Sequence, residues 1–163
     1  MNIKISMLIL LTTLCLAEGV DERITNVKLG IAQSNTQLEN ETDNLYFGAD
    51  LMFDSKGFSF GIGFDYIGLQ SNRNSSSNYI AAPQIKVGYN LEELTTLPIL
   101  LKADVGYGVT RYEDENHWQA QYGGSIEIKL YKGLGAGIGY KYVDTDTRLG
   151  EVDNTMAYLS LFF

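Results

Sequence analysis

Hydrophobic and polar side chains alternate with a period of two along most of the chain. Clusters of Gly, Asn, Asp and Ser separate the alternating runs, which cover about residues 23–33, 44–53, 58–66, 79–90, 98–110, 117–130, 134–142 and 154–163. A period of two is typical of β-strands with one apolar and one polar face, whereas an amphipathic helix repeats every 3.6 residues. The pattern therefore predicts an all-β protein with eight antiparallel strands in up-and-down order.

The final run closes on an aromatic residue. Alternation places one set of side chains on its apolar face: Thr155, Ala157, Leu159, Leu161 and Phe163. An apolar-faced strand that closes on Phe163 is typical of bacterial outer-membrane β-barrels.

The first 17 residues have the pattern of a secretory signal. A basic start that includes Lys4 precedes an apolar stretch, and Cys15, Leu16 and Ala17 form a small-residue cleavage site. The stretch of about 10 apolar residues is too short for a membrane-spanning helix, which needs about 20. We therefore expect a signal peptide over residues 1–17 and one barrel domain over residues 18–163. The only cysteine lies in the signal, so the domain has no thiol for a disulfide or a metal.

The net charge of −8 argues against nucleic acid as a partner. No stretch after the signal is apolar enough to form a transmembrane helix. If the chain spans a membrane, a closed barrel is the structure that satisfies its backbone hydrogen bonds in lipid.

Glycine and charges of both signs occupy the polar face of the predicted strands. Small residues are expected where eight strands crowd their side chains into a narrow interior, and opposite charges neutralise one another when they are buried together. We therefore expect the polar face to line the lumen. The predicted ion-pair network consists of Lys28, Asp50, Asp65, Lys86, Lys102, Asp104, Glu127, Lys129 and Lys141. We also expect bulky side chains to obstruct the lumen, namely Tyr46, Met52, Gln121 and Tyr158.

Aromatic residues on the apolar face gather near the strand ends, as in the two interfacial girdles of a membrane barrel. The girdle toward the tight turns is predicted to contain Phe53, Phe58, Tyr89 and Phe163, and the girdle toward the longer loops Tyr66, Tyr79, Trp118 and Tyr142.

Connection lengths predict the orientation. The connections after the second and sixth strands are tight, whereas those at 34–43, 70–78, 111–116 and 144–153 are longer and polar. An even number of strands puts both termini at the tight-turn end, which we expect to face the periplasm. Residues 91–97 are long for such a turn and predict a short helical turn. Pro83 predicts a bulge or a strand that begins late, because a closed barrel has no edge strand to host it.

The signal, the eight alternating runs and Phe163 together resemble the small outer-membrane barrels typified by the OmpA transmembrane domain, OmpX, Opa and NspA. The resemblance covers the whole mature chain and rests on architecture. It implies a monomer in the Gram-negative outer membrane, in contact with outer-membrane lipids and lipopolysaccharide. It also implies that the barrel-assembly machinery recognises the C-terminal strand.

No catalytic or cofactor site is predicted. The lipid A deacylase pattern places a serine two residues after its histidine, but Gln119 follows His117 at that position, and Ser125 lies too far along the strand. Acidic loop residues are weak candidates for calcium or magnesium, and loop solubility explains them better: Glu113, Asp114, Glu115, Asp144 and Asp146.

The sequence thus predicts a non-enzymatic outer-membrane protein with a role in envelope integrity or surface interaction. Two alternatives remain open. One is a narrow pore for ions or small solutes, and the other is a secreted lipocalin-like protein that binds a small molecule inside its barrel.

Overall fold

The computed structural model describes residues 22–36, 42–69, 78–112, 115–131, 133–145 and 150–163. The predicted signal peptide over residues 1–17 lies outside them. The strands and the short helix of this described part are β1 (Glu22–Asn35), β2 (Thr42–Ser55), β3 (Phe58–Leu69), β4 (Asn78–Asn90), α2 (Glu92–Thr95), β5 (Ile99–Tyr112), β6 (Glu115–Tyr131), β7 (Leu134–Val143) and β8 (Val152–Phe162). Among the described residues, no helix has the length and apolar character needed to cross a membrane.

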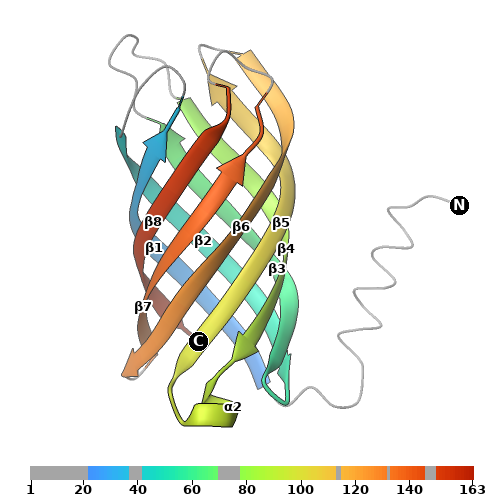
Figure 1. Cartoon of the computed structure of the whole chain (residues 1–163), viewed down its shortest axis with the longest axis vertical. Coiled ribbons are helices and arrows are strands. Elements are labelled where there is room, and N and C mark those ends of the chain that lie inside the picture. Colours follow the sequence, from blue (N-terminus) through green and yellow to red (C-terminus); the bar gives the residue numbers. More distant parts are fainter. Residues whose placement is uncertain (1–21, 37–41, 70–77, 113–114, 132, 146–149) are drawn as a thin grey trace, which may run out of the picture.

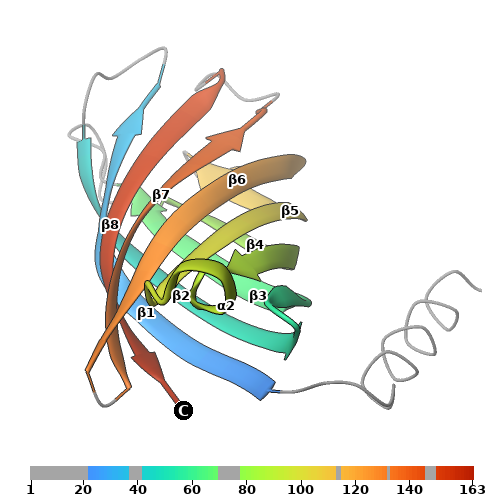
Figure 2. The ribbon, with the colours of Figure 1, turned by 60° about the horizontal axis from the view of Figure 1, so that its bottom comes forward.

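The strands form one closed antiparallel barrel in sequence order, which confirms the predicted fold class. The strands tilt relative to the long axis (Figure 1), as closure of a sheet requires. β8 completes the wall by pairing with β1, from Asn26 opposite Phe162 to Asn35 opposite Asp153. The helix α2 and the C-terminal end of β8 lie at the same end of the barrel as the tight turns (Figures 1 and 2).

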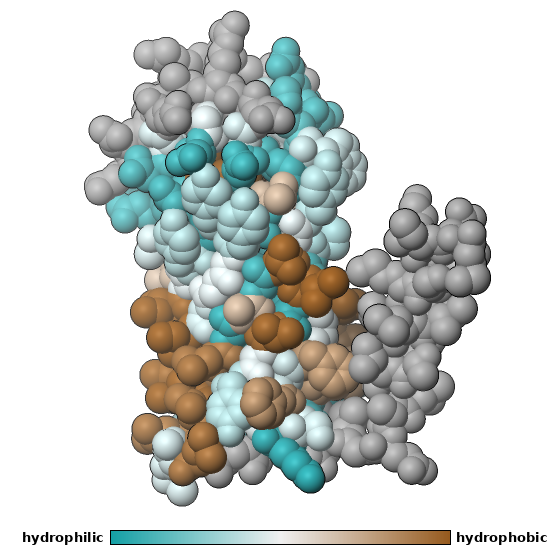
Figure 3. Space-filling model, turned by 45° about the vertical axis from the view of Figure 1, so that its right-hand side comes forward, coloured by the Kyte–Doolittle hydropathy of each residue, from teal (hydrophilic) through white to brown (hydrophobic). Residues whose placement is uncertain are grey.

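Side chains alternate between the lumen and the outer surface. On β1, for example, Lys28 is 2% exposed whereas its neighbour Leu29 is 59% exposed. The outer surface is polar near the long-loop end and strongly apolar lower on the wall (Figure 3). This arrangement inverts that of a soluble barrel and matches a wall surrounded by lipid.

The connections differ most from the predicted ones after the fifth strand. The predicted short helical turn within 91–97 is present as α2. The longer loop predicted at 111–116 is wrong, because Arg111 pairs with Asn116 and Tyr112 pairs with Glu115. These polar residues extend the β5–β6 hairpin and leave residues 113–114 between the two strands.

Pro83 lies within a continuous strand, so the predicted bulge or late strand start is wrong. β4 begins at Asn78, and Pro83 pairs in register with Phe64 of β3. On the other side, the β4–β5 ladder stops at Ala81 opposite Val109 and resumes at Gln84 opposite Gly106. Proline has no N–H to donate, so the wall loses ladder pairs at this position without changing its register.

Close approach between strands explains glycine at Gly61. A Cβ added there would lie 2.1 Å from the backbone oxygen of Leu51 and 2.6 Å from the Cα of Met52. At Gly68, by contrast, the nearest heavy atom would be 3.7 Å away, an ordinary contact distance.

We therefore predict that Gly61→Ala destabilises the barrel by about 1–3 kcal/mol because the β2 backbone has to move. Gly68→Ala is the matched control and is expected to change stability by less than about 0.5 kcal/mol. Urea unfolding of the two folded variants, followed by gel mobility, measures the difference. Equal urea midpoints for the two variants would contradict a close approach between β3 and β2 at Gly61.

Candidate functional site

Eight charged side chains point into the lumen and form one connected network. Each side chain is at most 7% exposed, and the four ammonium groups balance the four carboxylates: Lys28, Lys86, Lys102, Lys141, Asp50, Asp65, Asp104 and Glu127. A buried charge is costly unless it is paired and hydrogen-bonded. The balance of charge therefore makes this interior possible.

Asp50 of β2 is the centre of the network. Its carboxylate forms salt bridges with the ammonium groups of Lys28 at 2.5 Å, Lys86 at 2.7 Å and Lys102 at 2.9 Å. These lysines come from β1, β4 and β5, so one carboxylate connects four strands across the lumen.

A second carboxylate extends the network toward the long-loop end. Asp65 of β3 contacts Lys86 at 3.4 Å and also pairs with Lys141 of β7. Lys141 in turn lies 3.2 Å from Asp104 of β5. The hydroxyl of Tyr46 donates a hydrogen bond to Asp65 at 3.0 Å, which adds a neutral donor to this carboxylate.

The remaining contacts bring in β6 and β8. Lys102 pairs with Glu127 of β6, whose oxygens also accept hydrogen bonds from the Asn26 amide at 3.3 Å. The ammonium of Lys28 lies 5.4 Å from the ring centroid of Tyr158 on β8, within range of a cation–π contact. The network therefore contacts every strand of the wall.

Glycines on the inner face make room for these long side chains. An added Cβ at Gly63 would meet the Cε of Lys86 at 2.4 Å and Asp50 at 2.7 Å. One at Gly48 would meet the Tyr46 hydroxyl at 2.6 Å and Asp65 at 2.8 Å. The glycines are thus part of the site, because the long side chains of the network occupy the space that a Cβ would take.

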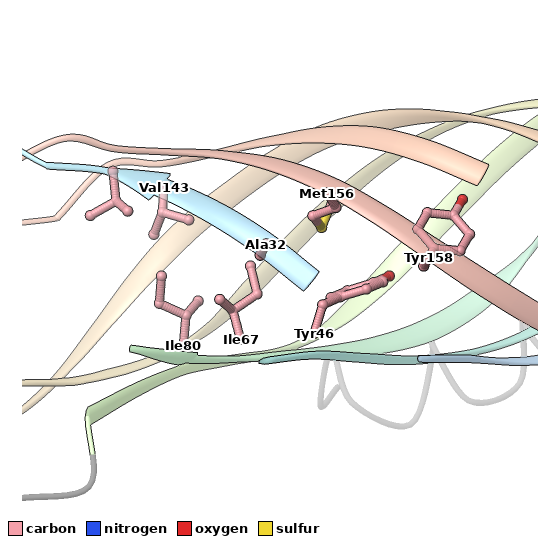
Figure 4. Close-up of a cluster of buried hydrophobic side chains, with 8 residues drawn as sticks. Ala32, Tyr46, Ile67, Ile80, Val143, Met156 and Tyr158 are labelled. Carbon is pink, nitrogen blue, oxygen red and sulfur yellow. The ribbon is translucent and has the colours of Figure 1, made fainter. Parts of the chain in front are cut away.

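An apolar layer lies in the lumen on the long-loop side of the network, beside the buried polar side chains of Thr110 and Gln121. It is formed by Ala32, Tyr46, Ile67, Ile80, Val143, Val152, Met156 and Tyr158. Figure 4 shows these side chains pointing inward from opposite walls. The rings of Tyr46 and Tyr158 lie 5.5 Å apart. Gln121, also predicted to obstruct the lumen, is 1% exposed.

A smaller apolar layer lies on the tight-turn side. Ile24, Met52 and Leu100 are at most 3% exposed, and Phe162 packs against them. The ionic layer therefore lies between two apolar layers.

Sequence reasoning predicted Tyr46, Met52 and Tyr158 inside the lumen but not the aliphatic residues around them. Those residues occupy inward positions toward the strand ends, and the alternation of each strand was the signal that could have found them. Sequence reasoning also missed a neutral cluster near the long-loop end, where Asn44 donates to Ser34 at 2.8 Å and Ser34 donates to Asn154 at 2.6 Å.

Lys129 is the one predicted network residue that lies apart from the other eight. Its ammonium is 5.7 Å from the ring centroid of Phe162, near the tight-turn end. Within the described part of the chain, no carboxylate pairs with it. On β6, Lys129 lies two residues beyond Glu127 toward the tight-turn end, where it pairs in register with Gly135 of β7.

The aromatic residues predicted as girdles lie on the outer surface near both ends of the strands. Phe58 and Tyr89 pack edge to face at 4.7 Å near the tight-turn end. Tyr66 and Tyr79 stack at 5.6 Å near the long-loop end. Phe53 packs on Phe60, Trp118 stacks on Tyr107, Tyr142 stacks on Tyr122, and Phe163 is 77% exposed.

The candidate metal ligands are only partly described. Glu113, Asp114 and Asp146 lie outside the described residues. Glu115 contacts His117 at 3.3 Å, and Asp144 is exposed beyond β7. Among the side chains that the structure describes, no group of three or more His, Cys, Asp or Glu could hold a metal ion.

Comparisons with solved structures identify the fold as that of the small eight-stranded outer-membrane barrels. Neisserial surface protein A (NspA) matches with a TM-score of 0.61 and 11% identity, over 90% of this chain and 100% of that one. Ail of Yersinia pestis, solved in a phospholipid bilayer nanodisc, matches with a TM-score of 0.58 and 13% identity, over 87% and 100%.

A designed transmembrane β-barrel also matches, with a TM-score of 0.55 and 7% identity over 90% of this chain and 98% of that one. The likeness therefore concerns architecture. No family model matches this chain, and no curated protein matches it either.

Asp50→Asn tests the centre of the network. The substitution leaves three ammonium groups facing a neutral amide, and we predict a loss of about 3–5 kcal/mol in stability. Asp43→Asn, at an exposed position of β2, is the control and is expected to cost less than about 0.5 kcal/mol. Urea unfolding in lipid vesicles measures both values. A cost for Asp50→Asn as small as the control's would contradict a central role.

Two lysine substitutions test the separate position of Lys129. Lys102→Met leaves the buried carboxylate of Glu127 without an ammonium partner and removes one of the three partners of Asp50, so it is predicted to cost about 3–5 kcal/mol. Lys129→Met removes only a cation–π contact, so its predicted cost is about 1 kcal/mol or less. The same unfolding assay compares them, and similar losses would show that Lys129 shares the network.

Proposed function

We propose that this protein is a non-enzymatic integral protein of the Gram-negative outer membrane. Its barrel serves as a closed scaffold that contributes to envelope integrity and presents its loops at the surface. The observation that carries this proposal is the filled lumen, in which an ionic layer lies between two apolar layers.

The filled lumen argues against a pore. A permeating ion would have to separate buried ion pairs around Asp50 and then cross the layer around Tyr46 and Tyr158. Both steps are costly because they separate buried charges and move an ion past apolar side chains. An eight-stranded barrel is already just wide enough for its own side chains.

A secreted lipocalin-like protein is also disfavoured. Such a barrel keeps apolar side chains inside around its ligand and polar ones outside. Here Leu29, Phe58 and Ile138 are 59%, 68% and 61% exposed, while four lysines lie inside.

The wall supports an outer-membrane location. Its exposed apolar band lies between two aromatic groups, a distribution typical of barrels in lipid. The fold is that of outer-membrane barrels such as NspA and Ail. We propose that the chain lies there as a monomer with both termini in the periplasm and contacts phospholipid and lipopolysaccharide. We further propose that the barrel-assembly machinery recognises β8.

Planar-bilayer recording tests the closed scaffold. The refolded protein is expected to insert without producing single-channel steps, because both apolar layers and the ionic layer block the lumen. Insertion is checked separately by protease protection in vesicles. Stable, reproducible conductance steps from the inserted monomer would favour the pore.

Fractionation tests the location. We expect the protein in the outer-membrane fraction, released by detergent, with a gel mobility that changes on heating. A soluble monomer in the periplasm or medium, with no heat-dependent shift, would favour the lipocalin-like alternative.

A further inference from the structure

The inner wall has a glycine trough on the long-loop side of the ionic network. Two inward positions of β5 are glycines there, so side chains of β4 and β6 border the space over this strand. Gln84 of β4 and Gln121 of β6 pair with Gly106 from its two sides. The trough consists of Gly106, Gly108, Thr110, Gln84, Gln119 and Gln121.

The polar side chains of the trough are buried without a protein partner. Their exposed fractions are 0% for Thr110, 1% for Gln121, 3% for Gln84 and 5% for Gln119. Among the described residues, no group bonds to the Thr110 hydroxyl or to either amide atom of the three glutamines. A buried amide or hydroxyl without a hydrogen bond costs free energy. These groups therefore need partners from outside the chain.

The glutamines do not satisfy one another, although two of them share a glycine. A Cβ added to Gly106 would lie 2.8 Å from the Cγ of Gln84, so this side chain leans over β5. Gln121 borders the same glycine from β6, yet neither amide donates to the other. The two amides thus flank the space over Gly106 as separate polar groups.

Pro83 adds a backbone acceptor beside the trough. The bond from the N–H of Leu91 to the carbonyl of Ile99 shows that odd-numbered residues along β4 point their backbone groups toward β5. In this register Pro83 lies opposite Tyr107 and has no N–H to donate to its carbonyl. Tyr107 stands between the two glycines of the trough. Its carbonyl therefore lies where a ligand in the trough can reach it.

The apolar layer leaves this part of the lumen to polar groups. Its buried side chains come from the other six strands, and none of those described comes from β5 or β6. Toward the tight-turn end, the next inward residues of β5 are Asp104 and Lys102, which belong to the ionic network. The charges of that network already balance, so a neutral ligand suits the trough.

We propose that the glycine trough binds a cluster of water molecules. Water is neutral and small, and it both donates to amide oxygens and accepts from amide nitrogens. The acceptors and donors to be satisfied are six amide atoms, the Thr110 hydroxyl and the Tyr107 carbonyl. Since a buried water makes about three hydrogen bonds, on the order of three waters satisfy them.

The water cluster stabilises the barrel at the interrupted β4–β5 ladder. Its waters replace the bond that Pro83 cannot donate and connect β4, β5 and β6 through their glutamine and threonine side chains. This role goes beyond the scaffold function proposed above. It requires no conducting lumen, because Asp104 and Lys102 bound the trough toward the tight-turn end.

Solid-state NMR of the refolded protein in lipid vesicles tests the cluster. Transfer of magnetisation from water to the side-chain amides of isotope-labelled glutamine and asparagine shows which amides contact water. Gln84, Gln119 and Gln121 are expected to receive magnetisation several times faster than Asn154.

Asn154 is the internal control because it is buried and has protein partners at both amide atoms. It is 0% exposed, its oxygen accepts from the Ser34 hydroxyl at 2.6 Å, and its nitrogen donates to the Lys141 carbonyl at 3.2 Å.

Two near-isosteric variants provide an independent readout. Thr110→Val and Gln121→Met are expected to lower the urea midpoint, because the waters lose a partner. In a dry trough the same substitutions would remove an unsatisfied polar group and raise the midpoint. Gln33→Met, at an exposed position of β1, is the control and is expected to keep the wild-type midpoint.

The proposal is wrong if the three glutamine amides receive magnetisation from water at the same rate as Asn154. Equal slow rates would indicate a dry lumen, and equal fast rates would indicate an open, water-filled lumen. It is also wrong if either Thr110→Val or Gln121→Met keeps or raises the wild-type midpoint. The NMR comparison uses the wild-type protein, so it decides the matter even if a variant fails to fold.

Discussion

The charges inside the barrel have lost their contact with water, and the structure depends on how that loss is compensated. Asp50 and Glu127 are fully buried, and so is Lys141. Each is stable only while its partners from other strands remain in reach. The ion pairs therefore favour one register of the closed barrel, because a slip of one residue would turn these side chains to the outer surface. Glycine at positions 48 and 63 supports these ion pairs, because the absence of a Cβ leaves room for the long side chains to cross the lumen.

The apolar layers strengthen this constraint. The cluster around Tyr46 and the cluster around Met52 lie on the two sides of the ionic layer. They limit the access of water to the ion pairs, and a lower local dielectric makes each pair stronger and each unpaired group more costly. The closed scaffold that we propose rests on the same packing that holds the barrel together.

Strict alternation was sufficient to predict the eight strands and the inward position of eight network residues. It could not predict their pairing, because contacts such as Lys141 with Asp65 depend on the stagger between distant strands. Lys129 has the correct parity but lies below the network, near Phe162. Pro83 appeared incompatible with a continuous strand, yet only one of its two neighbouring ladders is interrupted. Val143 was missed because it lies one residue beyond the predicted run 134–142, and Ile80 because it was not assigned to either face of its strand.

Amine-specific labelling of the folded barrel, read by mass spectrometry, tests the sealed ionic layer most directly. Lys28, Lys86, Lys102 and Lys141 are expected to resist modification while Lys56, which is exposed at the β2–β3 turn, reacts. All five are expected to react once urea has unfolded the protein. Modification of the four lumen lysines in the folded protein at the rate of Lys56 would contradict a closed, paired interior.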